Sequence, residues 1–282
     1  MIKLLALDLD ETLLSNDKHV SKENIAALKK ARENGIHTVI ATGRPWFSFH
    51  ETLEEIGTRH LKDEYSISLN GGAIVENENG KIIELDGLDY PTTNMLFQRA
   101  LSDQNLCIHV NTTDTAYGWN LNDDERKFLK GRLEIIELKN PDLSAHQDEH
   151  FVKVLYGNTN INYLQNILEE MNTISGDFDV SFSSSRYLEF NKKGVNKGSG
   201  LKKLAKILDI DISQTAAIGD HANDLEMIKT AGLGIAVANA IDELKEAAKY
   251  ITTHDYDHHA VAEAVEYILE LNKKEREANQ TK

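Results

Sequence analysis

Two acidic residues near the N-terminus stand where a metal or phosphate site would need them. Asp8 and Asp10 lie at the end of the apolar segment Ile2–Leu9, which predicts a buried parallel strand. Ligands of open α/β sheets bind at the carboxyl ends of the strands. Carboxylates buried there are costly unless a cation or hydrogen-bond donors compensate. The alternative is a solvent-facing loop, since the same Asp-x-Asp spacing recurs at Asp177/Asp179, Asp209/Asp211 and Asp255/Asp257.

Two further segments have the residue types that bind phosphate. Thr42 and Gly43 follow an apolar strand expected over Ile36–Ala41, and a glycine beside a hydroxyl lets an oxyanion approach the backbone closely. Lys197 opens a predicted helix, where its ammonium and the free N–H groups can hold a phosphate. An ordinary strand-to-loop turn and a solvated lysine are the alternatives at these positions.

The segment Gly219–Asp224 carries a second pair of acidic residues. It follows an apolar strand expected over Thr215–Gly219 and precedes a helix. Asp220 and Asp224 are four positions apart, so both can lie near one point of that turn. A set of oxygen ligands without sulfur suits Mg²⁺. The alternative is a helix N-terminus with favourable acidic residues.

Alternating strands and helices must position these residues. Ser21 is a good N-cap for a helix that Gly35 ends, further helices are expected over 45–57 and 92–106, and a strand over Tyr65–Leu69. The alternation returns after residue 195 and implies a parallel sheet. We therefore expect an α/β fold with a Rossmann-like core of residues 1–85 and 191–282. Residues 86–190 would form an inserted α+β domain, and the polar tail 272–282 would be disordered.

Composition restricts the partners. The chain has 282 residues and a net charge of −15, which favours two domains and argues against coating nucleic acid. An anionic substrate would then be met by a local positive site, such as a metal. No apolar run reaches the roughly 20 residues of a membrane helix, and Asp8 interrupts the N-terminal run too early for a signal peptide. The single cysteine, Cys107, fits a reducing compartment, so we expect a cytoplasmic protein without nucleic acid or membrane partners.

Taken in order, the four segments resemble the motifs of the haloacid dehalogenase (HAD) superfamily of phosphohydrolases. Asp8-x-Asp10-x-Thr12 is similar to its first motif and Thr42 to its second. Lys197 resembles the third motif, and Gly219-Asp220-x-x-Asn223-Asp224 resembles the fourth.

The spacing resembles one subgroup of that superfamily. Asp10 and Thr42 are 32 positions apart, too few for a large insert, whereas Thr42 and Lys197 are 155 apart. An insert at this place resembles the type IIB cap domain of the Cof-like group. The segments Asn70–Ala73, Tyr187–Phe190 and Gly194–Gly198 are similar to that group as well.

The resemblance implies an aspartyl-phosphate mechanism. Asp8 would attack phosphorus, and Asp10 would protonate the leaving alcohol and then activate water. Mg²⁺ would be held by Asp8, by the backbone carbonyl of Asp10 and by Asp220, with Asp224 at the metal or at its bound water. The phosphoryl oxygens would be bound by Thr42, Gly43, Lys197 and Asn223, and the substrate contacted by Arg44, Asn70 and Gly71.

The function implied is a Mg²⁺-dependent phosphatase acting on a small phosphorylated metabolite, such as a sugar phosphate or pyridoxal phosphate. A phosphosugar mutase is one alternative, and isomer formation in place of phosphate release would distinguish it. A non-catalytic phospholigand-binding protein is the other, although Asp8, Asp10 and Lys197 are all present.

Weaker signals lie outside the four motifs. The segment His254–His259 could form a second metal site or the acidic start of the last helix. His221 could bring an imidazole near the site, although a solvent-facing position in its loop is expected. Candidate substrate contacts in the insert are His109, Tyr117, Trp119 and Arg186, although aromatic residues on short strands more often belong to a core.

Overall fold

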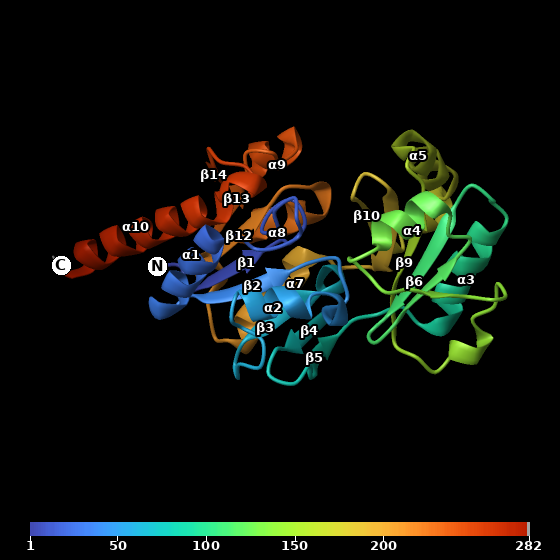
Figure 1. Ribbon diagram of the computed structural model, residues 1–282, viewed down its shortest axis with the longest axis horizontal. Coiled ribbons are helices and arrows are strands. Elements are labelled where there is room, and N and C mark those ends of the chain that lie inside the picture. The colour runs from blue at the N-terminus through green and yellow to red at the C-terminus, as the bar shows by residue number, and fades with distance from the viewer. Residues whose placement is uncertain (281–282) are drawn as a thin grey trace.

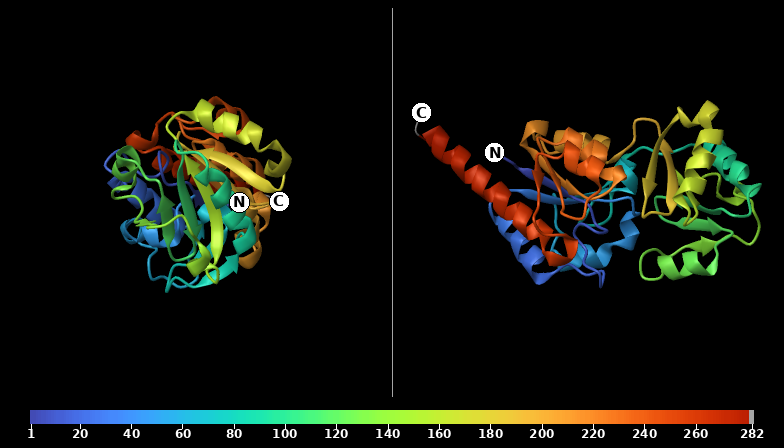
Figure 2. Two further views of the ribbon diagram at one scale, coloured as in Figure 1. Left: turned by 90° about the vertical axis from the view of Figure 1, so that its right-hand side faces the viewer. Right: turned by 90° about the horizontal axis from the view of Figure 1, so that it is seen from above.

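The computed structural model describes residues 1–280 and contains two β-sheets in two bodies that lie side by side (Figures 1 and 2). An eight-stranded sheet has the order β14-β13-β12-β1-β2-β3-β4-β5, and a six-stranded sheet has the order β10-β11-β9-β6-β7-β8. The eight-stranded sheet comes from both ends of the chain and the six-stranded sheet from its middle. The predicted α/β core with an α+β insertion is thereby confirmed.

The eight-stranded unit is a parallel sheet with an antiparallel edge. The neighbouring strands β14, β13, β12, β1, β2 and β3 pair in parallel. The β3–β4 and β4–β5 pairs at the other edge are antiparallel. Its strands are β1 (Leu4–Leu7), β2 (His37–Ala41), β3 (Tyr65–Ser68), β4 (Ala73–Glu76), β5 (Ile82–Leu85), β12 (Thr215–Gly219), β13 (Leu233–Ala236) and β14 (Tyr250–Ile251). Its helices are α1 (Lys22–Glu33), α2 (His50–Glu55), α7 (Lys197–Ile207), α8 (Leu225–Thr230), α9 (Asp242–Ala247) and α10 (Ala260–Gln280).

The six-stranded unit is antiparallel except for the β7–β8 pair. Its strands are β6 (Cys107–Thr112), β7 (Ala116–Trp119), β8 (Ile136–Glu137), β9 (Phe151–Gly157), β10 (Phe178–Ser183) and β11 (Tyr187–Lys192). Its helices are α3 (Tyr90–Leu101), α4 (Asp123–Leu129), α5 (Ile161–Glu170) and α6 (Asn172–Ser175). The division of the chain at residues 86 and 190 stays a prediction.

Local sequence explains the elements that carry the site. All four residues of β1 are buried, as a central parallel strand requires. Helix α1 begins after Ser21, whose hydroxyl accepts the Asn24 N–H at 3.2 Å, and it ends before Gly35 at φ +77°. These ends agree with the predicted helix.

Three predicted elements are wrong in extent. Residues 45–57 form a short 3₁₀ turn at Trp46–Ser48 followed by α2, and not one helix. Helix α3 ends at Leu101, because residues 103–106 turn into β6.

The tail is the third error, since residues 272–280 continue α10. Asn272 is buried there, accepting the Ile2 N–H at 2.6 Å and donating to the Ile2 carbonyl at 2.8 Å. The carboxylate of Glu275 pairs with the N-terminal amine. The prediction relied on the pattern of apolar residues, and that pattern cannot reveal polar contacts with the first residues of the chain. Residues 281–282 of the predicted tail lie outside the described residues.

Candidate active site

Asp8 stands directly after β1, at the carboxyl edge of the eight-stranded sheet. Its N–H donates to the Ile218 carbonyl on neighbouring β12 at 3.0 Å, which fixes the backbone between two buried strands. The Asp8 side chain is buried, and its Oδ1 accepts from Lys197 Nζ at 2.5 Å. Burial and the nearby Asp224 carboxylate raise the pKa of Asp8, and Lys197 opposes that rise.

Lys197 joins two carboxylates at the start of α7. The Asn196 side chain accepts the Ser199 N–H at 2.9 Å, so this helix begins at Lys197. Lys197 Nζ lies 2.5 Å from Asp8 Oδ1 and 2.6 Å from Asp224 Oδ1, and its side chain is fully buried. Burial disfavours the ammonium, but Asp224 and Asp8 outweigh it and raise the pKa of Lys197. The lysine is therefore a fixed positive charge.

The loop after β12 adds two carboxylates to the same point. Asp220 accepts the Thr12 hydroxyl at 3.0 Å. The second oxygen of Asp224 accepts the N–H groups of Asp220 and His221 at 3.0 and 3.1 Å, which closes the loop. Burial, Asp8 and Asp224 together raise the pKa of Asp220. The loop thus gathers negative charge at one place.

These residues fit a divalent cation. Asp8, Asp220 and Asp224 are buried, and one carboxylate oxygen of each lies within 4.8 Å of the others. Lys197 is the one cation in contact with them in the described part of the chain. Three buried carboxylates facing one ammonium leave negative charge without a partner, and that is costly. Oxygen donors of this kind suit a hard cation.

Thr42 and Gly43 follow β2 on the same edge of the sheet. The Thr42 hydroxyl accepts the Arg44 N–H at 3.1 Å, which leaves the hydroxyl proton free to donate. A Cβ at Gly43 would lie 2.9 Å from Asn70 Oδ1 and 3.5 Å from Lys153 Nζ. The position therefore needs glycine because side chains from both units converge on it.

Asp10 is held by two arginines. Arg44 donates from Nε and Nη2 to the two Asp10 oxygens at 2.8 and 2.5 Å. Arg132, from the loop after α4 in the six-stranded unit, donates to Oδ1 at 3.4 Å. Burial favours a neutral carboxyl, but Arg44 and then Arg132 outweigh it and lower the pKa of Asp10.

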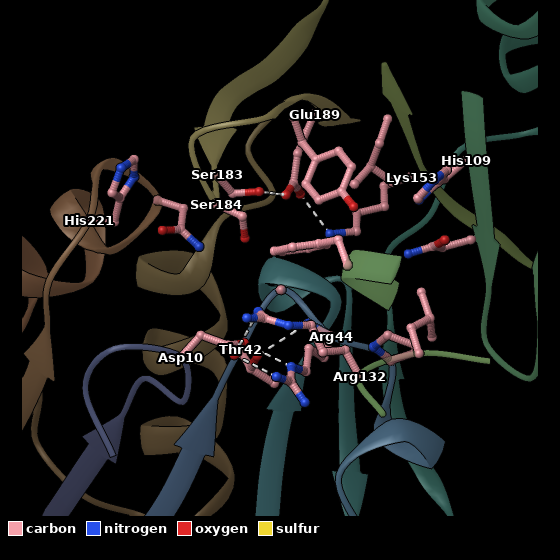
Figure 3. A pocket seen from close by; sticks show the side chains of 18 of the residues that line it. Asp10, Thr42, Arg44, His109, Arg132, Lys153, Ser183, Ser184, Glu189 and His221 are labelled. Atoms are coloured by element: carbon pink, nitrogen blue, oxygen red, sulfur yellow. Dashed lines mark hydrogen bonds and ion pairs between the residues drawn. The ribbon is translucent and has the colours of Figure 1, made fainter. Parts of the chain in front are cut away.

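A cavity of about 270 Å³ opens onto these residues and is lined by both units (Figure 3). Seven predicted site residues line it: Asp8, Asp10, Thr42, Gly43, Arg44, Asp220 and Asn223. Lys197 and Asp224 lie behind Asp8. Asn70 and Gly71 are not in the wall. Gly71 instead packs on the Asn196 backbone, and its ideal Cβ would lie 2.3 Å from the Asn196 oxygen.

The six-stranded unit supplies a wall that the motifs did not predict. Glu189 on β11 accepts from Lys153 Nζ on β9 at 2.6 Å and from the Ser183 hydroxyl on β10. It also accepts from Asn70 Nδ2 at 2.6 Å, which joins the wall to the eight-stranded unit. Lys153 and Glu189 are both buried. In the sequence, the feature that could have identified Lys153 and Glu189 is a charged residue inside an otherwise apolar strand. Arg132, in a loop, has no such feature.

The weaker sequence signals have mixed outcomes. His221 lines the cavity, so its predicted exposure to solvent is wrong. His109 also lines it, 3.2 Å from Glu125. Tyr117 packs in the hydrophobic core of the six-stranded unit, with Trp119 against that core. Arg186 pairs with Glu125 at 2.8 Å.

The segment His254–His259 does not gather around a common point. His254 pairs with Glu263 at 2.8 Å and His258 with Asp255 at 2.7 Å, both at the surface. Among residues 1–280, the three groupings that could hold a metal do not include this segment.

Comparison with known proteins agrees with this fold and site. The family model described as haloacid dehalogenase-like hydrolase matches residues 5–265. Two Bacillus subtilis proteins are each 28% identical: phosphatase YwpJ, with 95% of this chain and 100% of that protein aligned, and 5-amino-6-(5-phospho-D-ribitylamino)uracil phosphatase YcsE, with 94% and 95%.

Solved structures share the whole architecture. A haloacid dehalogenase-like hydrolase from Bacteroides thetaiotaomicron has a TM-score of 0.80 and 30% identity, over 95% of this chain and 100% of that one. A sugar phosphatase of HAD subclass IIB has a TM-score of 0.80 over 94% and 98%, and at 21% identity it supports the fold alone. Its subclass fits the six-stranded unit as a cap domain over the eight-stranded core.

The fold and the carboxylate site thus define a phosphatase enzyme. The chain belongs to the haloacid dehalogenase-like hydrolases, within the Cof-like group, as its motifs predicted. None of the helices in residues 1–280 combines the length and the apolar character needed to cross a membrane.

Proposed function

We propose that this enzyme is a Mg²⁺-dependent phosphatase that hydrolyses small phosphorylated metabolites through an aspartyl-phosphate on Asp8. The observation that carries the proposal is the buried group of Asp8, Asp220 and Asp224, which contacts one ammonium among the described residues, that of Lys197. Mg²⁺ held by these carboxylates would offset the repulsion between Asp8 and an anionic phosphate ester. Asp10 would add its backbone carbonyl to the ligand set.

The contacts of Asp8 suit a nucleophile. Lys197 binds Oδ1, and Oδ2 has no hydrogen bond among the described residues, so Oδ2 would attack phosphorus. As that bond forms, the bond from phosphorus to the ester oxygen breaks. Arg44 and Arg132 favour the ionised form of Asp10, so Asp10 would first have to gain a proton as the substrate engages these arginines, and it would then give that proton to the departing oxygen. It would then take a proton from the water that attacks phosphorus and releases Asp8.

The neighbouring residues would bind the phosphoryl oxygens. The free proton of the Thr42 hydroxyl can donate to one oxygen, and the absence of a side chain at Gly43 lets another approach the backbone. Asn223 lines the same cavity and would donate from its amide. Such fixed donors stabilise charge as it redistributes during phosphoryl transfer.

The cavity supports a small substrate. Its volume of about 270 Å³ is slightly below the range of about 300–1,000 Å³ that is usual for small-molecule sites. YcsE is named for a phosphorylated ribityl compound, and the subclass IIB neighbour is a sugar phosphatase. Sugar phosphates, pyridoxal phosphate and similar esters are therefore the proposed substrates. We also propose a cytoplasmic location, because Cys107 is a buried free thiol.

We further propose that residues 1–85 and 191–282 form the core and residues 86–190 the cap. Residues of both parts line the cavity, and Asn70 of the core donates to the wall residue Glu189 at 2.6 Å. A cap in this position would exclude bulk water and large substrates from Asp8.

The test is phosphate release from a panel of small phosphate esters, with Mg²⁺ or EDTA. Wild-type protein should release phosphate only with Mg²⁺, and Asp8→Asn should be slower by about 10³-fold or more. Asp148→Asn, which removes an exposed carboxylate of the cap, is the matched control and should keep wild-type activity. Phosphate release by Asp8→Asn within tenfold of wild type would refute the nucleophile, and isomer formation would indicate a mutase.

A further inference from the structure

Arg132 is held on a fixed platform at the cavity wall. Its guanidinium lies over the Phe128 ring, 4.1 Å from the ring centroid. The guanidinium of Arg186 lies 3.9 Å from the same centroid. Arg186 is itself anchored by Asp124 and Glu125 at 3.0 and 2.8 Å. Arg132 therefore reaches the cavity from an ordered support in the cap (Figure 3).

The guanidinium of Arg132 has few hydrogen-bond partners, although it lies at the cavity wall. Its one hydrogen bond within residues 1–280 is the 3.4 Å contact with Asp10 Oδ1. A guanidinium carries five N–H donors, so most of them remain available to the cavity. Asp10 accepts only one of them, and it is shared with Arg44, which binds both of its oxygens at 2.8 and 2.5 Å.

Three cations, Lys18, Arg44 and Arg132, lie near enough to one another to interact, although the chain has a net charge of −15. Burial lowers the pKa of Lys18, and the positive charges of Arg132 and Arg44 lower it further. These three cations are opposed by the carboxylates of Asp10 and Glu11. Lys153, on the other cavity wall, differs because Glu189 pairs with it at 2.6 Å. Arg132, in contrast, shares its carboxylate partner with Arg44.

We propose that Arg132, together with Arg44, binds a second anionic group on the leaving-group part of the substrate. The inference rests on the proposed phosphatase function and narrows its substrate class to phosphate esters that carry a carboxylate or a second phosphate. A guanidinium binds either group through paired N–H donors. The second anion would lie beside Asp10, apart from the phosphoryl group at Asp8 and Lys197.

Matched substrates test the proposal. Glucose 6-phosphate is compared with 6-phosphogluconate, which adds a carboxylate, and fructose 6-phosphate with fructose 1,6-bisphosphate, which adds a phosphate. Arg132→Met keeps an unbranched stem on Phe128 and removes the charge. It should lower kcat/KM for the member with the second anionic group by about tenfold or more relative to the member without that group, mainly through KM.

Two variants separate charge from structure. Arg132→Lys should recover part of the preference for the charged member, because it restores a cation without the paired donors. Arg126→Ala removes an arginine of α4 that pairs with Glu137 outside the cavity, and it should leave every ratio unchanged. The two substrate pairs differ in the added group, a carboxylate in one and a phosphate in the other. The pair whose kcat/KM ratio changes more in Arg132→Met identifies which of these groups the arginines bind.

The proposal would be overturned if Arg132→Met lowered kcat/KM equally for the members with and without the second anionic group, or did not lower it for either. If wild-type protein releases no phosphate from any ester, the proposed function fails, and calorimetric binding of the same four compounds tests Arg132 instead. Tighter binding of the charged members that disappears in Arg132→Met would then uphold the anion site. Binding of all four compounds that is unchanged by Arg132→Met would refute it.

Discussion

Two groups of buried charge face the same cavity, and they are built in opposite ways. In the core, the buried carboxylates of Asp8, Asp220 and Asp224 lie together, and within residues 1–280 the one cation that contacts this group is Lys197, through Asp8 and Asp224. In the cap wall, Glu189 meets Lys153 at 2.6 Å and also accepts from Asn70 and Ser183. The core group has an excess of negative charge, whereas the wall group is internally neutral.

The difference separates a ligand site from a supporting network. A buried ion pair whose remaining lone pairs are hydrogen-bonded needs nothing further. A buried excess of carboxylates is unfavourable until a cation arrives. The core group is therefore incomplete by itself, and the wall group holds side chains in place around it.

The largest effect is expected from removing the shared cation in the core. Lys197→Met leaves Asp8 and Asp224 buried without their ammonium. It should lower kcat/KM by about 10²- to 10³-fold and destabilise the metal-free protein by about 3–5 kcal/mol. Phosphate release and urea unfolding in EDTA measure both. Lys202→Met, at an exposed position of the same helix, is the control and should change neither.

The second prediction is that the same chemical change has opposite effects in the two groups. Glu189→Gln leaves the Lys153 ammonium buried without its carboxylate and should cost about 3–5 kcal/mol of unfolding free energy. Asp220→Asn removes one of three crowded carboxylates, so stability in EDTA should be equal or higher.

A double variant sharpens this result. Lys153→Met combined with Glu189→Gln should lose much less stability than Glu189→Gln alone, because no unpaired ammonium remains. If Asp220→Asn and Glu189→Gln destabilise the metal-free protein equally, the contrast between the two groups is wrong.

The smallest effect concerns Glu263, a carboxylate that accepts mainly from N–H and hydroxyl groups and has the His254 imidazole beside it. Glu263 accepts from the Thr253 and His254 N–H groups at 2.8 and 3.0 Å and from Tyr250. Burial opposes ionisation, but these donors outweigh it and lower the pKa of Glu263 to about 2.

The unfolded chain has a glutamate pKa near 4.3, so the stabilisation is complete above that pH and disappears as pH falls through about 2. Glu263→Gln should therefore lower the Tm at pH 6 and have a progressively smaller effect below pH 4. A Tm difference that does not change with pH would contradict this assignment.

The core site could be predicted from the sequence because its residues follow strands. Asp8, Thr42 and Asp220 each come directly after an apolar run, and parallel strands bring their carboxyl ends to one edge. The cap wall could not be predicted in this way. Lys153, Glu189 and Arg132 meet the core only through tertiary packing between the two units. The helical tail was missed for a similar reason, since Asn272 is held by the backbone of Ile2.

The most direct test of the unbalanced core group is calorimetric titration of Mg²⁺ into metal-free wild-type protein and Asp220→Asn, with folding of both checked by circular dichroism. The account predicts one ion per wild-type chain and binding weaker by about tenfold or more in the variant, because one of the three carboxylates is lost. Absence of Mg²⁺ binding by folded wild-type protein, or equal affinity in Asp220→Asn, would contradict it.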